Sequence, residues 1–225
     1  MKLVTFQTKN ALAVLQKTGI LQADVDHINL KKYAVPYGYI VAYMKKKIPP
    51  ARNEKYPLWV WVKCGSSSAP RKVKNYAGKK QDLVKITFEK PDKEVLLSDY
   101  MAYSFILSGH IVPKTKKEYE KFLKMIEKGG ISVADLKGVV RQEKVSRKVK
   151  ELFPKIEKTW NRIFVLRSNV YQGCVWNIKM SEVKKIEVIN DPNHIYGTMN
   201  AKQLDGTRPD WKKQYLKFLS DKNNS

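Results

Sequence analysis

The stretch "LWVWVKC", from Leu58 to Cys64, carries apolar residues on both faces of any strand that it forms. Its β-branched and aromatic residues favour a strand, and apolar side chains on both faces are typical of a central position in a sheet. Trp59 and Trp61 share one face of such a strand, because alternate residues point the same way. Paired tryptophans on a central strand usually belong to the core. We therefore expect a fold built around this strand.

Strand and helix patterns follow one another on both sides of this stretch. Further strands are predicted at residues 2–8, 82–88, 93–98, 162–168, 174–180 and 184–189. Helices are predicted at residues 10–19, 37–48 and 99–109, the first of them ending at Gly19 and the third near Gly109. We predict an α+β fold, with a single mixed-sheet domain over residues 1–191 and a basic helical insertion at about residues 113–158. A tail over residues 192–225 contains a short amphipathic helix, "WKKQYLKFL".

Within the insertion, the segment "VADLKGVVRQEKVSRKVKEL", residues 133–152, can form either one helix or two. No glycine stands where a tight turn would need one, and the apolar periodicity runs on through Arg141. We therefore predict one continuous helix. The alternative is a helix-turn-helix, whose second helix would be rich in Arg and Lys.

The balance of charge indicates an anionic partner. The chain has 44 Lys and Arg against 21 Asp and Glu, which gives a formal net charge of +23. The excess positive charges repel one another in the compact folded state. Nucleic acid is the simplest partner that relieves it, and an acidic protein is the second. No apolar stretch is long enough to span a membrane, so we expect no membrane partner. Only Cys64 and Cys174 are present and no signal peptide precedes them, so we expect a cytoplasmic protein.

Motifs of self-sufficient catalytic sites are missing from the sequence. P-loops, nucleophile elbows and Rossmann glycines do not occur, so the residues alone leave open whether the protein is an enzyme. His27, His110 and His194 stand apart from one another and from the cysteines, and we expect no metal site. These residues also give no reason to expect a cofactor.

Two basic segments are candidates for phosphate contact. The first is a loop of small and basic residues whose backbone N–H groups can approach phosphates, with a tyrosine that can stack on a base. The second is the basic face of the predicted continuous helix. The candidate residues are Lys63, Arg71, Lys72, Lys74, Tyr76, Lys79 and Lys80 in the loop, and Lys137, Arg141, Lys144, Arg147, Lys148 and Lys150 on the helix.

The stretches "VTFQT", "LQKTGIL", "YPLWVWVKC", "VLLSDY" and "YQGCVWNIKMSEVKKIE" together resemble an uncharacterised family of small bacterial proteins, a domain of unknown function. This resemblance covers most of the chain and implies a compact α+β cytoplasmic protein. The order of elements is also similar to the layout of ADP-ribosyltransferases, in which a first-strand residue helps to hold NAD and a late-strand glutamate stabilises the oxocarbenium ion. Gln7 and Gln172 stand at these two positions, so this resemblance implies them as catalytic candidates, with NAD as cofactor. A glutamine, however, brings no negative charge to a developing cation.

Three hypotheses for the function follow. The first is a nucleic-acid-binding protein, in which Trp59, Trp61, Gln172 and Trp176 line a pocket for a base, a nucleotide or another flat ligand. The second is an ADP-ribosyltransferase-like enzyme, such as a toxin or a phage–host conflict factor, that modifies nucleic acid or protein. The third is a stoichiometric inhibitor of an acidic protein. The choice between DNA and RNA and the oligomeric state stay open.

Overall fold

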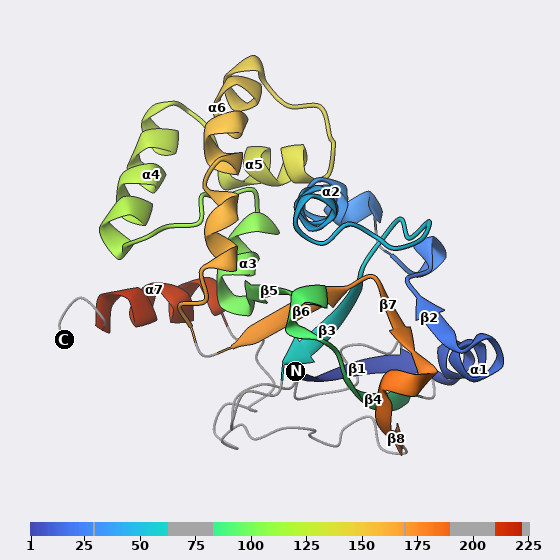
Figure 1. Cartoon of the computed structure of the whole chain (residues 1–225). Helices are drawn as coiled ribbons and strands as arrows, with labels where there is room; N and C mark the ends of the chain where they lie inside the picture. Colours follow the sequence, from blue (N-terminus) through green and yellow to red (C-terminus); the bar gives the residue numbers. More distant parts are fainter. Residues whose placement is uncertain (29, 63–82, 169, 190–209, 222–225) are drawn as a thin grey trace. The chain divides into compact units, whose positions relative to one another are not determined.

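The computed structural model describes residues 1–28, 30–62, 83–168, 170–189 and 210–221, which form two compact units (Figure 1). The sheet unit takes the described residues of Met1–His27, Tyr43–Leu97 and Tyr171–Thr207. The helical unit takes the described residues of Ile28–Ala42, Ser98–Val170 and Arg208–Ser225, and so contains the predicted insertion. Helices and a largely antiparallel sheet occupy different parts of the chain, which confirms the α+β class.

The sheet has six strands in the order β5-β6-β3-β1-β4-β8. Their bounds are β1 Lys2–Thr8, β3 Leu58–Val62, β4 Leu83–Glu89, β5 Leu96–Asp99, β6 Tyr171–Val175 and β8 Val183–Ile189. The predicted central strand is β3, which pairs with β1 on one side and β6 on the other. These two pairings and those of β1–β4 and β4–β8 are antiparallel, whereas we expected a mixed sheet. Strand direction depends on where the connecting segments return, which a local sequence pattern does not record.

One face of the sheet carries the core of the sheet unit. Leu3 is the register partner of both Val62 and Phe88, so these three buried side chains stand in a row across β3, β1 and β4. Helix α1 (Lys9–Thr18) and the ribbon of β2 (Ile20–Gln22) with β7 (Asn177–Lys179) pack further apolar residues against this row. Each large apolar side chain buried there contributes about 2 kcal/mol. The alternation of β1 therefore decides which of its residues face this core.

The helical unit contains α3 (Tyr100–Ile106), α4 (Lys116–Lys128), α5 (Val133–Val140), α6 (Arg147–Glu157), α7 (Trp211–Asp221) and most of α2 (Leu30–Lys47). Trp160 lies at its centre and is fully buried. Its ring meets those of Tyr39 and Phe153 edge-on, at centroid distances of 5.3 and 5.5 Å. Its indole N–H donates to the carbonyl of His110 at 2.9 Å. This side chain therefore joins α2, α6 and the segment after α3 into one core.

The segment 133–152 forms two helices, so the predicted continuous helix is wrong. Gln142 follows α5 in the left-handed region, with a φ of 60°. Its N–H donates to the carbonyl of Val139 at 2.9 Å, and the N–H of Glu143 donates to that of Gly138 at 2.8 Å, which is a Schellman ending. A Cβ at Gly138 would lie 2.9 Å from Cγ1 of Val145, so glycine there lets the turn pack against the helix. The glycine that this turn needs lies inside α5 rather than at its end.

Residues 162–168 do not form the predicted strand. The segment starts inside a 3-10 helix, Trp160–Phe164. The guanidinium of Arg162 donates to the carbonyl of Val112 at 2.9 Å and to the carboxylate of Glu118 at 2.8 Å. These contacts, together with the burial of Trp160, hold the chain in a helical turn although its residues favour a strand.

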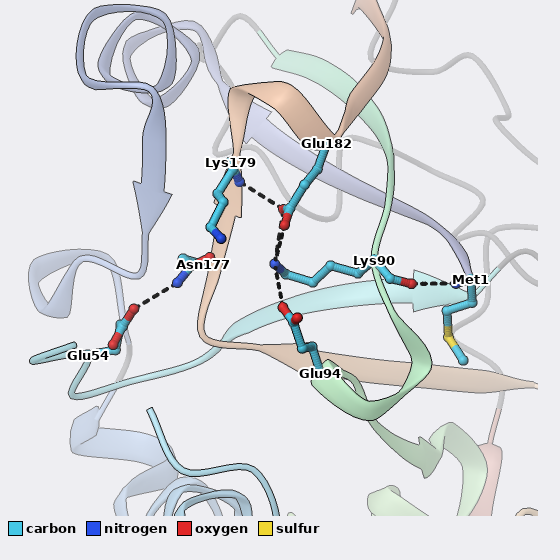
Figure 2. Close-up of polar contacts among 7 residues, drawn as sticks. All are labelled: Met1, Glu54, Lys90, Glu94, Asn177, Lys179 and Glu182. Carbon is cyan, nitrogen blue, oxygen red and sulfur yellow. Dashed lines mark hydrogen bonds and ion pairs between the residues drawn. The ribbon is translucent and has the colours of Figure 1, made fainter. Parts of the chain in front are cut away.

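A buried ion pair fixes the end of β4 in the sheet unit (Figure 2). The side chain of Lys90 is 3% exposed, and its amine donates to both carboxylate oxygens of Glu182, at 2.7 and 2.9 Å. The same amine reaches Glu94 at 3.3 Å, and Glu182 also accepts a hydrogen bond from the backbone N–H of Lys179 at 2.9 Å. The buried ammonium is therefore paired and hydrogen-bonded, as a buried charge must be.

Candidate nucleic-acid interface

Six exposed cations stand where α5 gives way to α6, and we call them the α5–α6 basic surface. They are Lys137, Arg141, Lys144, Arg147, Lys148 and Lys150. The first lies on α5, the next two in the connecting turn and the last three in the first turn of α6. The structure thus keeps every residue of the predicted basic helix face exposed, but distributes them around a turn instead of along one straight stripe.

The reverse side of these two helices is apolar. Leu136 and Val140 of α5 and Val149, Phe153 and Ile156 of α6 are all buried. Apolar residues at three- and four-residue spacing give each helix one inward stripe, so the charged residues between them point to solvent. The basic surface is therefore held in place by the core on which its helices pack.

Only part of the basic surface is neutralised by neighbouring carboxylates. Arg141 lies 3.7 Å from Glu143, and Arg147 lies 2.7 Å from Glu151, both as exposed pairs. Lys148 donates to a backbone carbonyl at 3.4 Å. Lys137, Lys144 and Lys150 form no ion pair in the part of the chain that the structure describes. Because exposed pairs are worth at most about 1 kcal/mol, a polyanion can displace the two that exist.

The first turn of α6 carries several cations at the positive end of the helix dipole. Its first turn contains Arg147, Lys148 and Lys150 and no acidic residue, and the side chain of Ser146 makes no capping hydrogen bond. The N-terminus of a helix carries partial positive charge, so these cations are repelled there by up to about 1 kcal/mol each. A phosphate at this end would relieve that repulsion and accept from the uncapped N–H groups.

Helix α7 carries a further cation of the helical unit, Lys212. This residue lies outside the two basic segments predicted from the sequence. Its amine lies 5.7 Å from the ring centroid of Phe105. Burial, and then the charge of Lys137, lower the pKa of Lys212 to about 8. The sequence signal was the pair Lys212 and Lys213 in an amphipathic stretch, but only the fold shows which of them turns inward.

His110 is a buried imidazole of the helical unit, 2% exposed. Its Nδ1 lies 2.8 Å from the hydroxyl of Tyr119, and its Nε2 has no hydrogen-bond partner among the described residues. Burial, and then the charges of Lys212 and Lys137, lower the pKa of His110 to about 3. The imidazole is therefore neutral at physiological pH.

The other predicted phosphate site lies outside the described residues. The predicted loop residues are Lys63, Arg71, Lys72, Lys74, Tyr76, Lys79 and Lys80, none of which the structure describes.

Three of the four predicted pocket residues share one face of the sheet. Trp61 is the register partner of Gln172, and Trp59 is that of Cys174, so all lie on the face opposite the core of the sheet unit. Trp176 stands apart, because the chain bends after β6 and its indole N–H donates to the carbonyl of Ile48 at 2.5 Å. The structure therefore brings together the two tryptophans of β3 and the glutamine of β6.

Gln7 and Gln172, the two predicted catalytic residues, lie on opposite faces of the sheet. Gln7 shares the core face with Leu3, since both are odd-numbered residues of β1, and its amide donates to Thr5 Oγ1 at 2.9 Å. Gln172 lies on the other face, and β3 separates its strand from β1. The two amides therefore cannot act on one substrate atom from these positions.

A hollow of about 620 Å³ lies in the sheet unit, lined by residues of α1, of β2 and the segment 23–25 after it, and of the segment 52–56. Its lining includes the carboxylates of Asp24 and Glu54. The carboxylate of Glu54 is already engaged, because Asn177 donates to it at 2.7 Å (Figure 2) and the backbone N–H of Arg52 donates to it at 2.7 Å. Its polar contacts are those of a structural carboxylate. Within the described residues, no helix is long and apolar enough to cross a bilayer, and no group of three or more His, Cys, Asp or Glu could hold a metal ion.

Residues 2–184 match the model of a protein family described as a domain of unknown function, DUF3841. The match covers most of the chain, so the chain belongs to this family, as its sequence motifs predicted. No curated protein and no solved structure matches the chain. The resemblance to ADP-ribosyltransferases therefore has no support from these comparisons.

Proposed function

Because membership of a family of unknown function supplies no activity, we propose a function from the charge and geometry of the helical unit. The protein binds nucleic acid through the α5–α6 basic surface. One observation carries this proposal: six exposed cations gather around one turn, and four of them have no carboxylate partner among the described residues. A formal net charge of +23 gives the whole chain the same preference for a polyanion.

Binding of this kind is driven by release of the counterions that surround the phosphates. If each of the six cations neutralises one phosphate of duplex DNA, the logarithm of affinity falls with the logarithm of salt with a slope of about −5. Affinity then falls roughly a thousandfold between about 50 and 200 mM salt. The four lysines favour contact with the phosphate backbone over reading of base edges, since an ammonium is a point charge without the planar fork of arginine.

The connection between the two helices supports backbone contact as well. A helix-turn-helix that reads the major groove joins its helices by a turn of about three or four residues. Here residues 141–146 separate α5 from α6, and two of the six cations lie in that connection. We therefore assign the turn and the first turn of α6 to phosphates and propose no reading of sequence.

A double charge reversal tests this assignment. Lys144→Glu with Lys150→Glu breaks no ion pair within the described part of the chain, because neither lysine forms one there. The affinity for a duplex oligonucleotide should fall, and the salt slope should become shallower by about two, one for each phosphate that is no longer neutralised. Lys121→Glu with Lys124→Glu on α4 is the matched control, since both lysines are exposed and the change in net charge is the same.

Equal decreases in affinity for the two double variants would show that only net charge matters. That result would contradict a binding interface at the α5–α6 basic surface. An acidic protein is the other anionic partner, and the same surface would serve it. A complex captured from lysate can be tested by nuclease digestion. If it survives digestion and is absent for the Lys144/Lys150 variant, the partner of this surface is an acidic protein and not nucleic acid.

A further inference from the structure

The side chain of Gln172 is a buried amide without a hydrogen-bond partner among the described residues. It is 5% exposed, and its Nε2 lies among the buried side-chain atoms that no donor or acceptor satisfies. Buried polar groups are almost always paired, because the alternative forfeits their hydrogen bonds to water. An apolar residue of the same length would avoid this cost. We therefore expect the amide to form its hydrogen bonds with a group that does not belong to the described residues of this chain.

Two aromatic side chains stand beside this amide on the same face of the sheet. Trp61 is directly opposite Gln172 in the pairing of β3 with β6, and directly opposite residues bring their Cβ atoms to about 5 Å. Trp59 is the next residue of β3 on that face and lies diagonally across from Gln172. Both indoles are only partly buried. The face thus places two partly buried aromatic side chains next to a group that needs hydrogen bonds.

Flat rings with a hydrogen-bonding edge match both features at once. A carboxamide offers a donor and an acceptor side by side, which pair with adjacent groups on the edge of a nucleobase, adenine above all. Indole rings stack on bases of any kind, because every base has a π face. An aliphatic ligand would leave the amide unpaired, and an inorganic anion would gain nothing from the indoles.

We propose that this face of the sheet is a nucleobase site, in which the amide of Gln172 pairs with the edge of the base while Trp59 and Trp61 contact its face. The base comes either from a free nucleotide or from an unpaired position in a nucleic acid. Only the second source rests on the proposed function. The site lies wholly within the sheet unit, whereas the α5–α6 basic surface belongs to the helical unit.

Uncharged nucleosides test this site without any contribution from phosphate. Adenosine, cytidine, guanosine and uridine are each titrated up to about 10 mM, with binding followed by tryptophan fluorescence and by calorimetry. We expect saturable quenching, strongest with adenosine and little changed by salt. Gln172→Leu should weaken adenosine binding about tenfold, the loss of one bidentate pair. The Leu variant should also unfold at higher urea than the parent, because it removes an unpaired buried amide.

The controls separate the amide from the indoles and this site from the basic surface. Trp61→Phe should keep part of the binding, and Lys144→Glu with Lys150→Glu should leave nucleoside affinity unchanged. Single-stranded oligonucleotides with and without adenine then distinguish a base within nucleic acid from a free nucleotide. The absence of saturable binding for all four nucleosides would overturn the site, and so would equal affinities in the parent and Gln172→Leu. Neither result would affect salt-dependent binding by the helical unit.

Discussion

Lowering the pH from about 7.5 to about 5 should weaken the fold through His110, and the loss can be calculated from two pKa values. Unfolded, a histidine has its usual pKa of 6.5, while burial and the nearby Lys212 and Lys137 lower the folded value to about 3. A group whose folded pKa is depressed favours the folded state above its unfolded pKa. That contribution disappears as the pH falls toward the folded value. The window of the effect is therefore from about pH 6.5 down to about pH 3.

Its size at pH 5 follows from the linkage relation. At that pH the unfolded imidazole is almost fully protonated and the folded one almost fully neutral, so the free energy of unfolding falls by about 2 kcal/mol. The charges that face the imidazole are those of Lys212 and Lys137, and its one hydrogen bond among the described residues is with Tyr119. No carboxylate of the described residues is among the groups that shift its pKa, so none there stabilises the protonated form.

Urea unfolding at the two pH values measures the loss, and His110→Gln supplies the comparison. The variant keeps a neutral polar side chain at this position, so its own stability can fall, but its stability should depend less on pH. The difference between the two proteins in their pH-induced loss should be about 2 kcal/mol. Tyr119→Phe is a second variant, which removes the hydrogen bond and leaves the burial; it should keep the pH dependence of the parent. Equal pH-induced losses in the parent and His110→Gln would refute the reasoning.

Three substitutions test other parts of the structure by urea unfolding. Glu182→Gln removes the main partner of the buried Lys90 and should cost about 3 kcal/mol, and a loss under about 1 kcal/mol would show that water solvates that amine. Gln142→Gly relieves a positive φ of 60° and should stabilise the protein by up to about 1 kcal/mol, whereas a destabilised variant would mean that the side chain itself supports the turn. Gly138→Ala places a Cβ 2.9 Å from Val145 and should destabilise by about 1–3 kcal/mol, so an unchanged midpoint would argue against the close approach.

The parts of the fold that local patterns determine were predictable. The central place of β3 follows from its own composition, and the shared face of Trp59 and Trp61 follows from the two-residue period of a strand. The end of α5 was not predictable in the same way. Glutamine has no preference for the left-handed conformation that Gln142 adopts. Glycine is needed at position 138 only because the turn folds back onto the helix. Both features arise from tertiary contact.

The candidate site shows the same division. The exposed cations of α5 and α6 could be read from their helical spacing, since the apolar residues between them had to face a core. The pairing of Trp61 with Gln172 depends on the register between two strands far apart in the sequence. The separation of Gln7 from Gln172 depends on that register too, because a shift by one residue exchanges the two faces of a strand. No local pattern records it.

The strand order has a consequence for how this protein is made in a cell. β5 ends at Asp99 and its neighbour β6 begins at Tyr171, so a segment of helices must be synthesised between two adjacent strands. At about 5–20 residues per second, the ribosome needs several seconds for that segment. During this time one edge of β3 lacks the strand that pairs with it in the finished sheet, and β3 carries the two tryptophans. An unpaired apolar edge is the kind of surface on which nascent chains aggregate, so the interval before β6 emerges is when this chain is most exposed to aggregation at β3.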